Sequence, residues 1–262
     1  MTRQSYRYRW VTELLGLTLI SILTACQSSI PSSPETDLPQ NSPGQMAEDL
    51  GETSSSTASE ANAFISAVES FPVWLTPVAT GEEQPAASGI SMVYGDALRT
   101  EKDGLAQVEL VNGLAFRIGG DATLILQPDN RLNLVSGEMI TWVNPGQQVP
   151  TEIVTPAGIV GLRGTTLFVS VPSNEEEEVL FFAWEGTIRL QVAAGAEEIL
   201  LKSGEELRVR PGELDVTTLR RRVRRLGQQE IRQRRRRSPL LNRFQQPLPT
   251  REQIEATLEA AP

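Results

Sequence analysis

Few residues of this chain could carry out chemistry. The 262-residue sequence has no histidine, and its one cysteine is Cys26. This composition excludes imidazole bases, imidazole metal ligands, thiolate zinc sites and disulfide scaffolds. The adjacent pairs Glu197–Glu198 and Glu205–Glu206 could in principle serve a glycosidase, but neighbouring residues of a strand point to opposite faces. We therefore expect no enzyme activity, no cofactor and no metal, and a glycan-modifying enzyme is the weakest alternative.

Cys26 directly follows an apolar run, residues 14–25, which is preceded by three arginines. A helix needs ~20 apolar residues to span a membrane, so this run of twelve fits a signal-peptide core better. The end of the run, Leu23-Thr24-Ala25-Cys26, resembles the lipobox of bacterial lipoproteins. That resemblance implies an acylated Cys26 as the first mature residue, and two or more acyl chains anchor a protein firmly. The alternatives are an ordinary secretory signal and an uncleaved anchor helix.

The one dense glycine cluster covers residues 158–166. It does not fit a phosphate-binding loop, because no lysine follows its last glycine and no helical pattern comes after it. In one interpretation, Gly161 and Gly164 let a strand bend, and Arg163 ties neighbouring carbonyl groups together. In the other, Arg163 and Thr165 contact a carboxylate or phosphate ligand.

Arginines are concentrated near the end of the chain. The formal net charge is −9, yet residues 208–251 hold fourteen arginines against three acids. Such a run favours anionic partners: lipid phosphates, lipopolysaccharide, acidic polymers or the acidic face of the chain's own β-domain. Nucleic acid is an unlikely partner for an exported chain. The expected contacts are Arg220, Arg221, Arg224, Arg225, Arg234, Arg235, Arg236 and Arg237. The alternative is a solvated, mostly disordered linker.

Short strands are expected between about Ala63 and Arg210. Apolar residues alternate with polar ones on both sides of Asn112-Gly113, a pair that predicts a hairpin with both turn residues at positive φ. A glycine followed by an acid, or preceded by one, recurs and indicates strands that turn a corner and continue on another face. These glycines are Gly95, Gly120, Gly137, Gly186 and Gly204.

The fold class expected from these patterns is all-β: a compact β-sandwich with solenoid-like winding of short strands. We expect a signal peptide at 1–25, a disordered Ser/Pro-rich tether at 26–62 and the β-domain at 63–210. Residues 211–262 would form an Arg-rich basic tail, helical or disordered, with a short terminal helix. Asp215 or Thr217 would cap a helix in this tail, and Thr250 with Gln253 has the form of a capping box.

Several of these stretches, in this order and spacing, resemble the FecR domain: residues 94–100, 108–113, 118–124, 155–158, 161–165, 184–186 and 202–205. The Gly-x-Arg-Gly-Thr step at 161–165 is the most specific of them. The best-known FecR proteins are inner-membrane regulators of siderophore uptake. Their periplasmic domain contacts an outer-membrane receptor, and their cytoplasmic tail controls a sigma factor. The segment before the apolar run is too short for such a tail, so we expect no sigma-factor control here.

The expected protein is thus a non-catalytic lipoprotein facing the periplasm, at either the inner or the outer membrane. Its FecR-like domain would act as a binding module for an envelope protein, glycan or ligand. The main alternative is a signal-transducing regulator related to the siderophore-uptake sensors.

Overall fold

The structure is a computed structural model that describes residues 61–144 and 146–261. The expected signal peptide, Cys26 and the tether up to residue 60 lie outside the described residues. The described residues belong to one compact unit. None of the described helices has both the length and the apolar character needed to cross a lipid bilayer.

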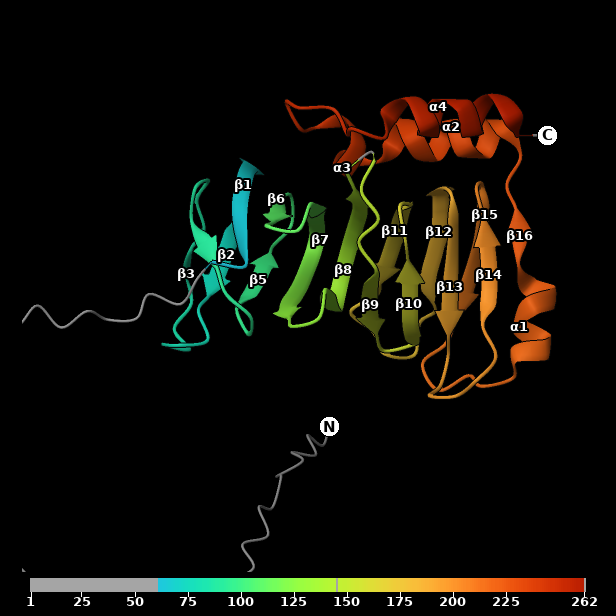
Figure 1. Ribbon diagram of the computed structural model, residues 1–262, viewed down its shortest axis with the longest axis horizontal. Coiled ribbons are helices and arrows are strands. Elements are labelled where there is room, and N and C mark those ends of the chain that lie inside the picture. Colours follow the sequence, from blue (N-terminus) through green and yellow to red (C-terminus); the bar gives the residue numbers. More distant parts are fainter. Residues whose placement is uncertain (1–60, 145, 262) are drawn as a thin grey trace, which may run out of the picture. The chain divides into compact units, whose positions relative to one another are not determined.

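The described strands form one continuous hydrogen-bonded sheet that folds over into two layers (Figure 1). Layer A contains, in spatial order, β4 (Ser91–Met92), β1 (Ala63–Ser70), β6 (Leu105–Leu110), the first half of β7 (Leu114–Gln127), the second half of β8 (Arg131–Val143), β11 (Thr166–Val171), β12 (Val179–Glu185), β15 (Glu205–Val209) and β16 (Arg224–Arg225). Layer B contains β3 (Gln84–Pro85), β2 (Val73–Thr76), β5 (Ala97–Thr100), the second half of β7, the first half of β8, β9 (Thr151–Thr155), β10 (Gly158–Leu162), β13 (Thr187–Gln191) and β14 (Ile199–Lys202). Every pairing is antiparallel except that of β8 with β9.

The long strands β7 and β8 bend together and so belong to both layers. Their pairing register is interrupted between Gly119 and Thr123, where a bulge lets β7 leave layer A and enter layer B. Gly137 stands opposite this bulge with φ of 84°, and a Cβ there would overlap the backbone of Ala122. Only glycine fits this position, because it tolerates positive φ and has no side chain to clash.

The predicted glycine corners coincide with changes of layer. All five glycines have positive φ: Gly95, Gly120, Gly137, Gly186 and Gly204. From β9 onward the chain places two strands in layer B, two in layer A, two more in B and two more in A. The all-β fold class is confirmed, and this alternation is the solenoid-like winding expected from the sequence.

The hairpin predicted at Asn112-Gly113 connects β6 to β7, but its turn differs from the prediction. The loop has three residues, 111–113, and Gly113 is its one residue with positive φ, 88°. The Gly113 N–H donates to the carbonyl of Leu110 at 3.0 Å. Three-residue loops place a single left-handed residue at their end, so Asn112 does not need the conformation that a two-residue turn would impose.

The space between layers A and B is filled mostly by Val, Leu and Ile. These inward-facing side chains come from both layers and include Ile65, Val108, Leu124, Leu134, Val160, Val169 and Leu201. Phe116 and Phe181 are the large aromatic members of this core. Because aromatic residues make up 5% of the chain, aliphatic alternation carries most of the packing.

The segment expected as a helical or disordered tail is helical. It forms α1 (Val216–Arg222), α2 (Gln228–Arg237), α3 (Pro239–Asn242) and α4 (Arg251–Ala260). Figure 1 shows α2, α3 and α4 on the layer A side of the sandwich. A second apolar core joins the outward side chains of layer A to this helical layer, and its members include Ile140, Trp142, Phe168, Phe182, Trp184, Leu226, Ile231, Leu240, Ile254 and Leu258.

Of the two predicted helix caps, one is confirmed and the other is wrong. Asp215 caps α1 as expected, because its Oδ1 accepts from the Thr218 N–H at 3.1 Å. The capping box at Thr250 is wrong, since the Thr250 side chain makes no cap hydrogen bond. Thr250 is buried, and its hydroxyl instead accepts from Thr166 Oγ1 at 2.8 Å. A tertiary hydrogen bond to the sheet replaces the local one.

Candidate functional site

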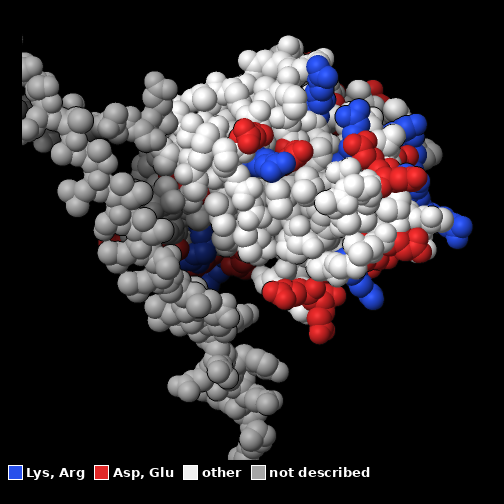
Figure 2. Space-filling model, turned by 60° about the horizontal axis from the view of Figure 1, so that its bottom comes forward, with Lys and Arg blue, Asp and Glu red and all other residues white. Residues whose placement is uncertain are grey.

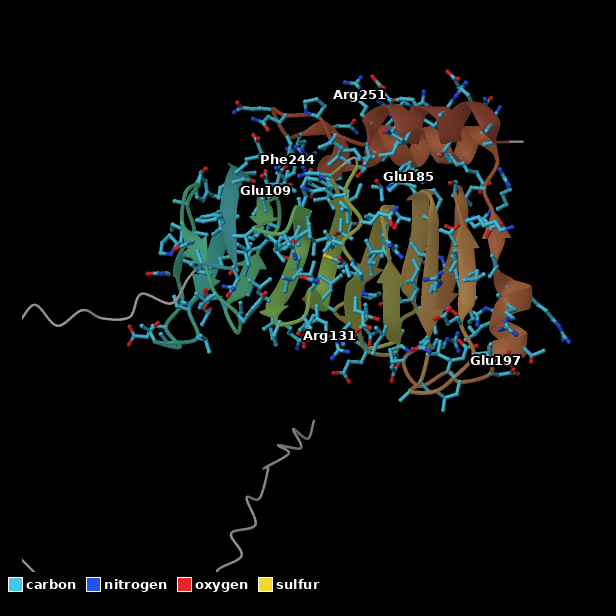
Figure 3. All side chains as sticks on the ribbon, viewed as in Figure 1. Glu109, Arg131, Glu185, Glu197, Phe244 and Arg251 are labelled. Atoms are coloured by element: carbon cyan, nitrogen blue, oxygen red, sulfur yellow. The ribbon has the colours of Figure 1, made fainter. Side chains whose placement is uncertain are left out.

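The outer surface of layer B is the part of the sandwich that the helices α2, α3 and α4 leave uncovered. We call it the open face and define it by the outward side chains of β8, β9, β10, β13 and β14. They include Arg131, Val135, Glu152, Ile159, Gly161, Arg189 and Leu200, and Arg163 directly follows β10 on the same face; Glu152 and Gly161 are half-buried and the others exposed. Figure 3 shows Arg131 near the bottom of the view, on the side opposite α2 and α4.

A shallow depression of about 440 Å³ lies on the open face around Gly161. Gly161 pairs with Glu152 on one side and Arg189 on the other. A Cβ at Gly161 would meet no atom closer than 3.9 Å, so packing does not require a glycine here. Its missing side chain instead leaves a low point between the flanking charged residues.

Arg163 is the basic residue of this depression that forms no ion pair with a described residue. Arg131 pairs with Glu152 at 2.6 Å, and Arg189 lies 3.4 Å from Glu198. Arg163 is exposed and makes no hydrogen bond or ion pair with any described residue. The expectation that Arg163 ties neighbouring carbonyl groups together is therefore wrong, although the chain does cross from layer B to layer A at residues 163–165.

Thr165 does not share the depression with Arg163. It is buried at the crossover, where its methyl group packs against Gly186. Its hydroxyl has no hydrogen-bond partner among the described residues. The structure thus separates the two residues that the sequence analysis grouped as ligand contacts, and leaves Arg163 alone on the surface.

The eight arginines expected to meet an anionic partner fall into two groups. Four form ion pairs with acids of the same chain: Arg220 with Glu197, Arg224 with Glu206 and Glu230, Arg234 with Glu206, and Arg235 with Glu255. The other four are exposed and form no ion pair with described residues: Arg221, Arg225, Arg236 and Arg237. Figure 2 accordingly shows basic and acidic side chains next to one another rather than one continuous basic surface.

Glu206 is the centre of an ion-pair network under the helical layer. It is 5% exposed, and its two carboxylate oxygens accept from Arg224 at 2.6 Å and Arg234 at 2.5 Å. Burial by itself would raise the pKa of Glu206, but the hydrogen bonds from Arg224 and Arg234 outweigh burial and hold that pKa below its ordinary value. Because Arg224 belongs to β16 and Arg234 to α2, the network ties the helical layer to layer A.

Arg117 is a structurally important residue that sequence reasoning missed. It is 1% exposed and donates to Gln107 Oε1 at 2.7 Å and to the carbonyls of Leu240 and Gln246 at 2.9 and 2.6 Å. Its guanidinium also lies 4.1 Å from the centre of the Phe244 ring. Burial lowers the pKa of Arg117 to about 10, so it remains charged at neutral pH. In the sequence Arg117 is one polar position in the alternation around Phe116, and nothing local indicates that this face is covered.

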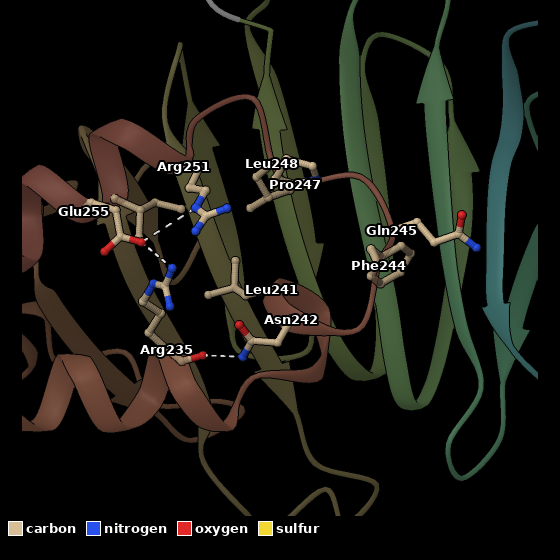
Figure 4. Close-up of a pocket in the computed structure, with 10 residues that line it drawn as sticks. Arg235, Leu241, Asn242, Phe244, Gln245, Pro247, Leu248, Arg251 and Glu255 are labelled. Carbon is tan, nitrogen blue, oxygen red and sulfur yellow. Dashed lines mark hydrogen bonds and ion pairs between the residues drawn. The ribbon is translucent and has the colours of Figure 1, made fainter.

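A cavity of about 280 Å³ lies within the helical layer itself (Figure 4). Its polar residues bond to one another: Arg235 to Glu255, and Asn242 Nδ2 to the carbonyl of Arg235 at 2.7 Å. Arg251 lies 4.0 Å from Glu255. These bonds close the end of α2 against α4, which is a structural role. Among the described residues no group of three or more His, Cys, Asp or Glu is placed to hold a metal ion.

Residues 96–189 match the family model described as FecR protein, which supports the FecR-domain resemblance found in the sequence. No curated protein matches this chain in sequence. Two crystal structures of a proposed anti-sigma factor from Parabacteroides distasonis ATCC 8503 are similar, each with 15% identity over 45% of this chain and with TM-scores of 0.39 and 0.38. The chain spans 56% and 57% of those two chains, little more than half of their length.

Proposed function

We propose that this protein is a non-catalytic regulator of the bacterial cell envelope, and that the open face of its FecR-type domain binds a partner protein. The family match supports the signalling alternative better than the unspecified binding module that the sequence analysis placed first. A regulator of this kind would report the state of a receptor or the supply of a nutrient by binding another protein.

The observation that carries the proposal is the composition of the open face. Arg163 forms no ion pair with any described residue and lines the same depression as Ile159, which is 36% exposed, while Leu200, 49% exposed, lies on the same face beside Arg189. Arginine next to apolar side chains is typical of the centre of protein–protein interfaces. The matched region, residues 96–189, also includes β8, β9, β10 and the first three residues of β13.

The adjacent glutamates, which a glycosidase would need, support a non-catalytic function. Each is engaged elsewhere: Glu197 with Arg220, Glu198 with Arg189, and Glu206 with Arg224 and Arg234. Glu205 accepts from the Lys202 N–H at 2.8 Å. Carboxylates held in separate surface contacts do not form the opposed pair across a cleft that glycoside hydrolysis requires.

The proposal includes export and anchoring through an acylated Cys26, supported by the lipobox-like residues 23–26. Cys26→Ser is expected to abolish acyl incorporation and to move the protein from the membrane fraction to the soluble fraction. Acyl label that persists in Cys26→Ser would contradict the anchor.

The four unpaired arginines support a second contact, with anionic lipid or an acidic polymer, because they are exposed and form no ion pair with described residues. Replacing Arg221, Arg225, Arg236 and Arg237 by glutamine should weaken salt-sensitive retention on anionic vesicles. Each arginine near such a surface contributes ~1 kcal/mol. Retention that is unchanged and insensitive to salt would reject this contact.

The regulatory function is tested in cells with the full-length chain. A strain lacking the gene should show altered expression of a defined set of genes, and the wild-type protein should restore it. The double variant Arg163→Glu/Arg189→Glu should fail to restore it, because it reverses the charge of the open face. The matched control Arg208→Glu/Arg232→Glu, at two exposed arginines outside the open face, should restore it.

A photo-crosslinking side chain at Ile159 or Leu200 should capture the partner, whereas one at Phe64, exposed on β1, should not. If deletion leaves gene expression unchanged, the regulatory proposal fails. If both double variants restore expression equally, the open face is not the contact surface.

A further inference from the structure

We infer that the groove between α2 and the outer face of layer A binds a small carboxylate that also carries a hydroxyl or amino group. This α2 groove has a volume of about 370 Å³. Its floor is apolar and is formed by Phe168, Leu180, Trp184 and Leu226. Polar residues from β8, β16 and the segment from α2 to the start of α3 form its walls: Glu138, Arg224, Glu230, Gln233, Arg234, Arg237 and Ser238.

Half of the unpartnered buried polar atoms of the described residues belong to residues that line this groove. Six buried side-chain polar atoms of the described residues lack a hydrogen-bond partner. Three of the six belong to residues that line the α2 groove: Trp184 Nε1, Arg234 Nη1 and Ser238 Oγ. Trp184 is fully buried. Natural proteins keep few such atoms, and their gathering at one place points to a ligand that satisfies them.

The types of these atoms determine what the ligand must supply. An indole N–H and a guanidinium N–H can only donate, and a hydroxyl can do either. The ligand must therefore bring acceptors, and a carboxylate offers two oxygens that can each accept more than one hydrogen bond. A charged acceptor also makes the stronger bond with a guanidinium.

Arg234 is held in place before any ligand binds. Its Nη2 donates to Glu206 at 2.5 Å, and its guanidinium lies 4.4 Å from the centre of the Phe182 ring. These contacts fix the guanidinium plane and leave Nη1 without a partner. A donor that is already oriented loses little conformational entropy when a ligand binds.

Glu138 sets a second requirement for the ligand, a hydrogen-bond donor. It lines the same groove and is half-buried, and its carboxylate makes no hydrogen bond or ion pair with any described residue. Burial raises the pKa of its carboxyl group. A ligand whose carboxylate faces Arg234 and Ser238 can satisfy Glu138 only if it also carries a donor. The chemical class is therefore a small hydroxy acid or amino acid, and the site is independent of the open face.

The test observes the indole N–H of Trp184 by nuclear magnetic resonance in the ¹⁵N-labelled full-length protein. Trp184→Phe identifies its signal among those of the four tryptophans. The probes are L-lactate, L-malate, L-alanine and L-glutamate at millimolar concentration, with lactamide as a control that lacks the carboxylate. At least one probe should shift the Trp184 signal to saturation and leave the Trp74 and Trp142 signals unmoved. If no probe shifts it, or if lactamide shifts it equally, the inference is wrong.

Two variants check the location of the site. Ser238→Ala should weaken binding of the active probe about tenfold to a hundredfold, the effect of one hydrogen bond to a charged carboxylate. Glu138→Gln should change the relative affinity for hydroxy acids and amino acids, since it replaces a carboxyl by an amide. Thr165→Val is the matched control, because its unpartnered hydroxyl is equally buried but does not line the groove. Equal weakening by Thr165→Val and Ser238→Ala would overturn the assignment.

Discussion

The outer faces of the two layers are built by the same alternation of strand residues, yet they have opposite roles. On layer A the outward positions hold Trp142, Phe168 and Phe182, and the helices cover them. On layer B they hold Arg131, Arg163 and Arg189, and they remain exposed. The helical layer therefore packs on the face whose outward side chains are aromatic. The face with charged outward side chains stays exposed to solvent and to partners.

Arg117 and Arg163 show the same contrast between a covered and an exposed position. Arg117 lies under the helical layer, where three acceptors and an aromatic ring surround it. Arg163 lies on the open face with no partner among the described residues. Whether an arginine stabilises the fold or is free to bind a partner depends on whether the helical layer covers it, and not on the residue type.

The largest expected effect comes from removing an aromatic side chain of the covered face. Phe182→Ala should lower the free energy of unfolding by about 3–5 kcal/mol, because it leaves a cavity beneath α2. Leu200→Ala, on the open face, should change it by less than about 0.5 kcal/mol. Urea denaturation of both variants measures the difference, and similar losses would show that the two faces are not distinct.

The second-largest loss of stability is expected when Arg117 is replaced. Arg117→Met should cost about 3 kcal/mol of unfolding free energy, because it leaves the carbonyls of Leu240 and Gln246 and the amide of Gln107 without their donor. Hydrogen exchange should accelerate first in α3 and α4. If α3 and α4 exchange as slowly in Arg117→Met as in the wild type, Arg117 does not hold the helical layer on the sheet, and its contrast with Arg163 is wrong.

Glu206→Gln should cost about 1–3 kcal/mol at pH 7, because it weakens charge-assisted hydrogen bonds from Arg224 and Arg234. The pKa of Glu206 is lowered on folding, so its contribution is present above the ordinary value of 4.5 and is lost as the pH falls through the folded value. The gap between wild type and variant should therefore narrow below pH 4.5. Glu175→Gln, in the exposed loop between β11 and β12, is the control and should show no gap at any pH.

The smallest effect on stability is expected at the open face itself. Arg163→Met should change the free energy of unfolding by less than about 0.5 kcal/mol, since the side chain has no partner to lose. A thermal melt checks this. A loss as large as that of Arg117→Met would mean that Arg163 supports the fold, and the open face would lose its proposed role.

The sequence by itself determined the strands, the hairpin at Asn112-Gly113 and the corner glycines. These features depend on a period of two residues or on one residue's φ, which are local properties. They also account for the all-β class and for residues 96–189 resembling the FecR domain.

Only the tertiary structure decided which face is covered. Arg117 bonds to Leu240 and Gln246, and Thr166 to Thr250, across 84 to 129 positions of the chain. No local pattern contains such partners, so a buried arginine and a solvated one look alike in sequence. Burial depends on what the distant segment 226–258 packs against, and that choice is made by the aromatic outward face of layer A.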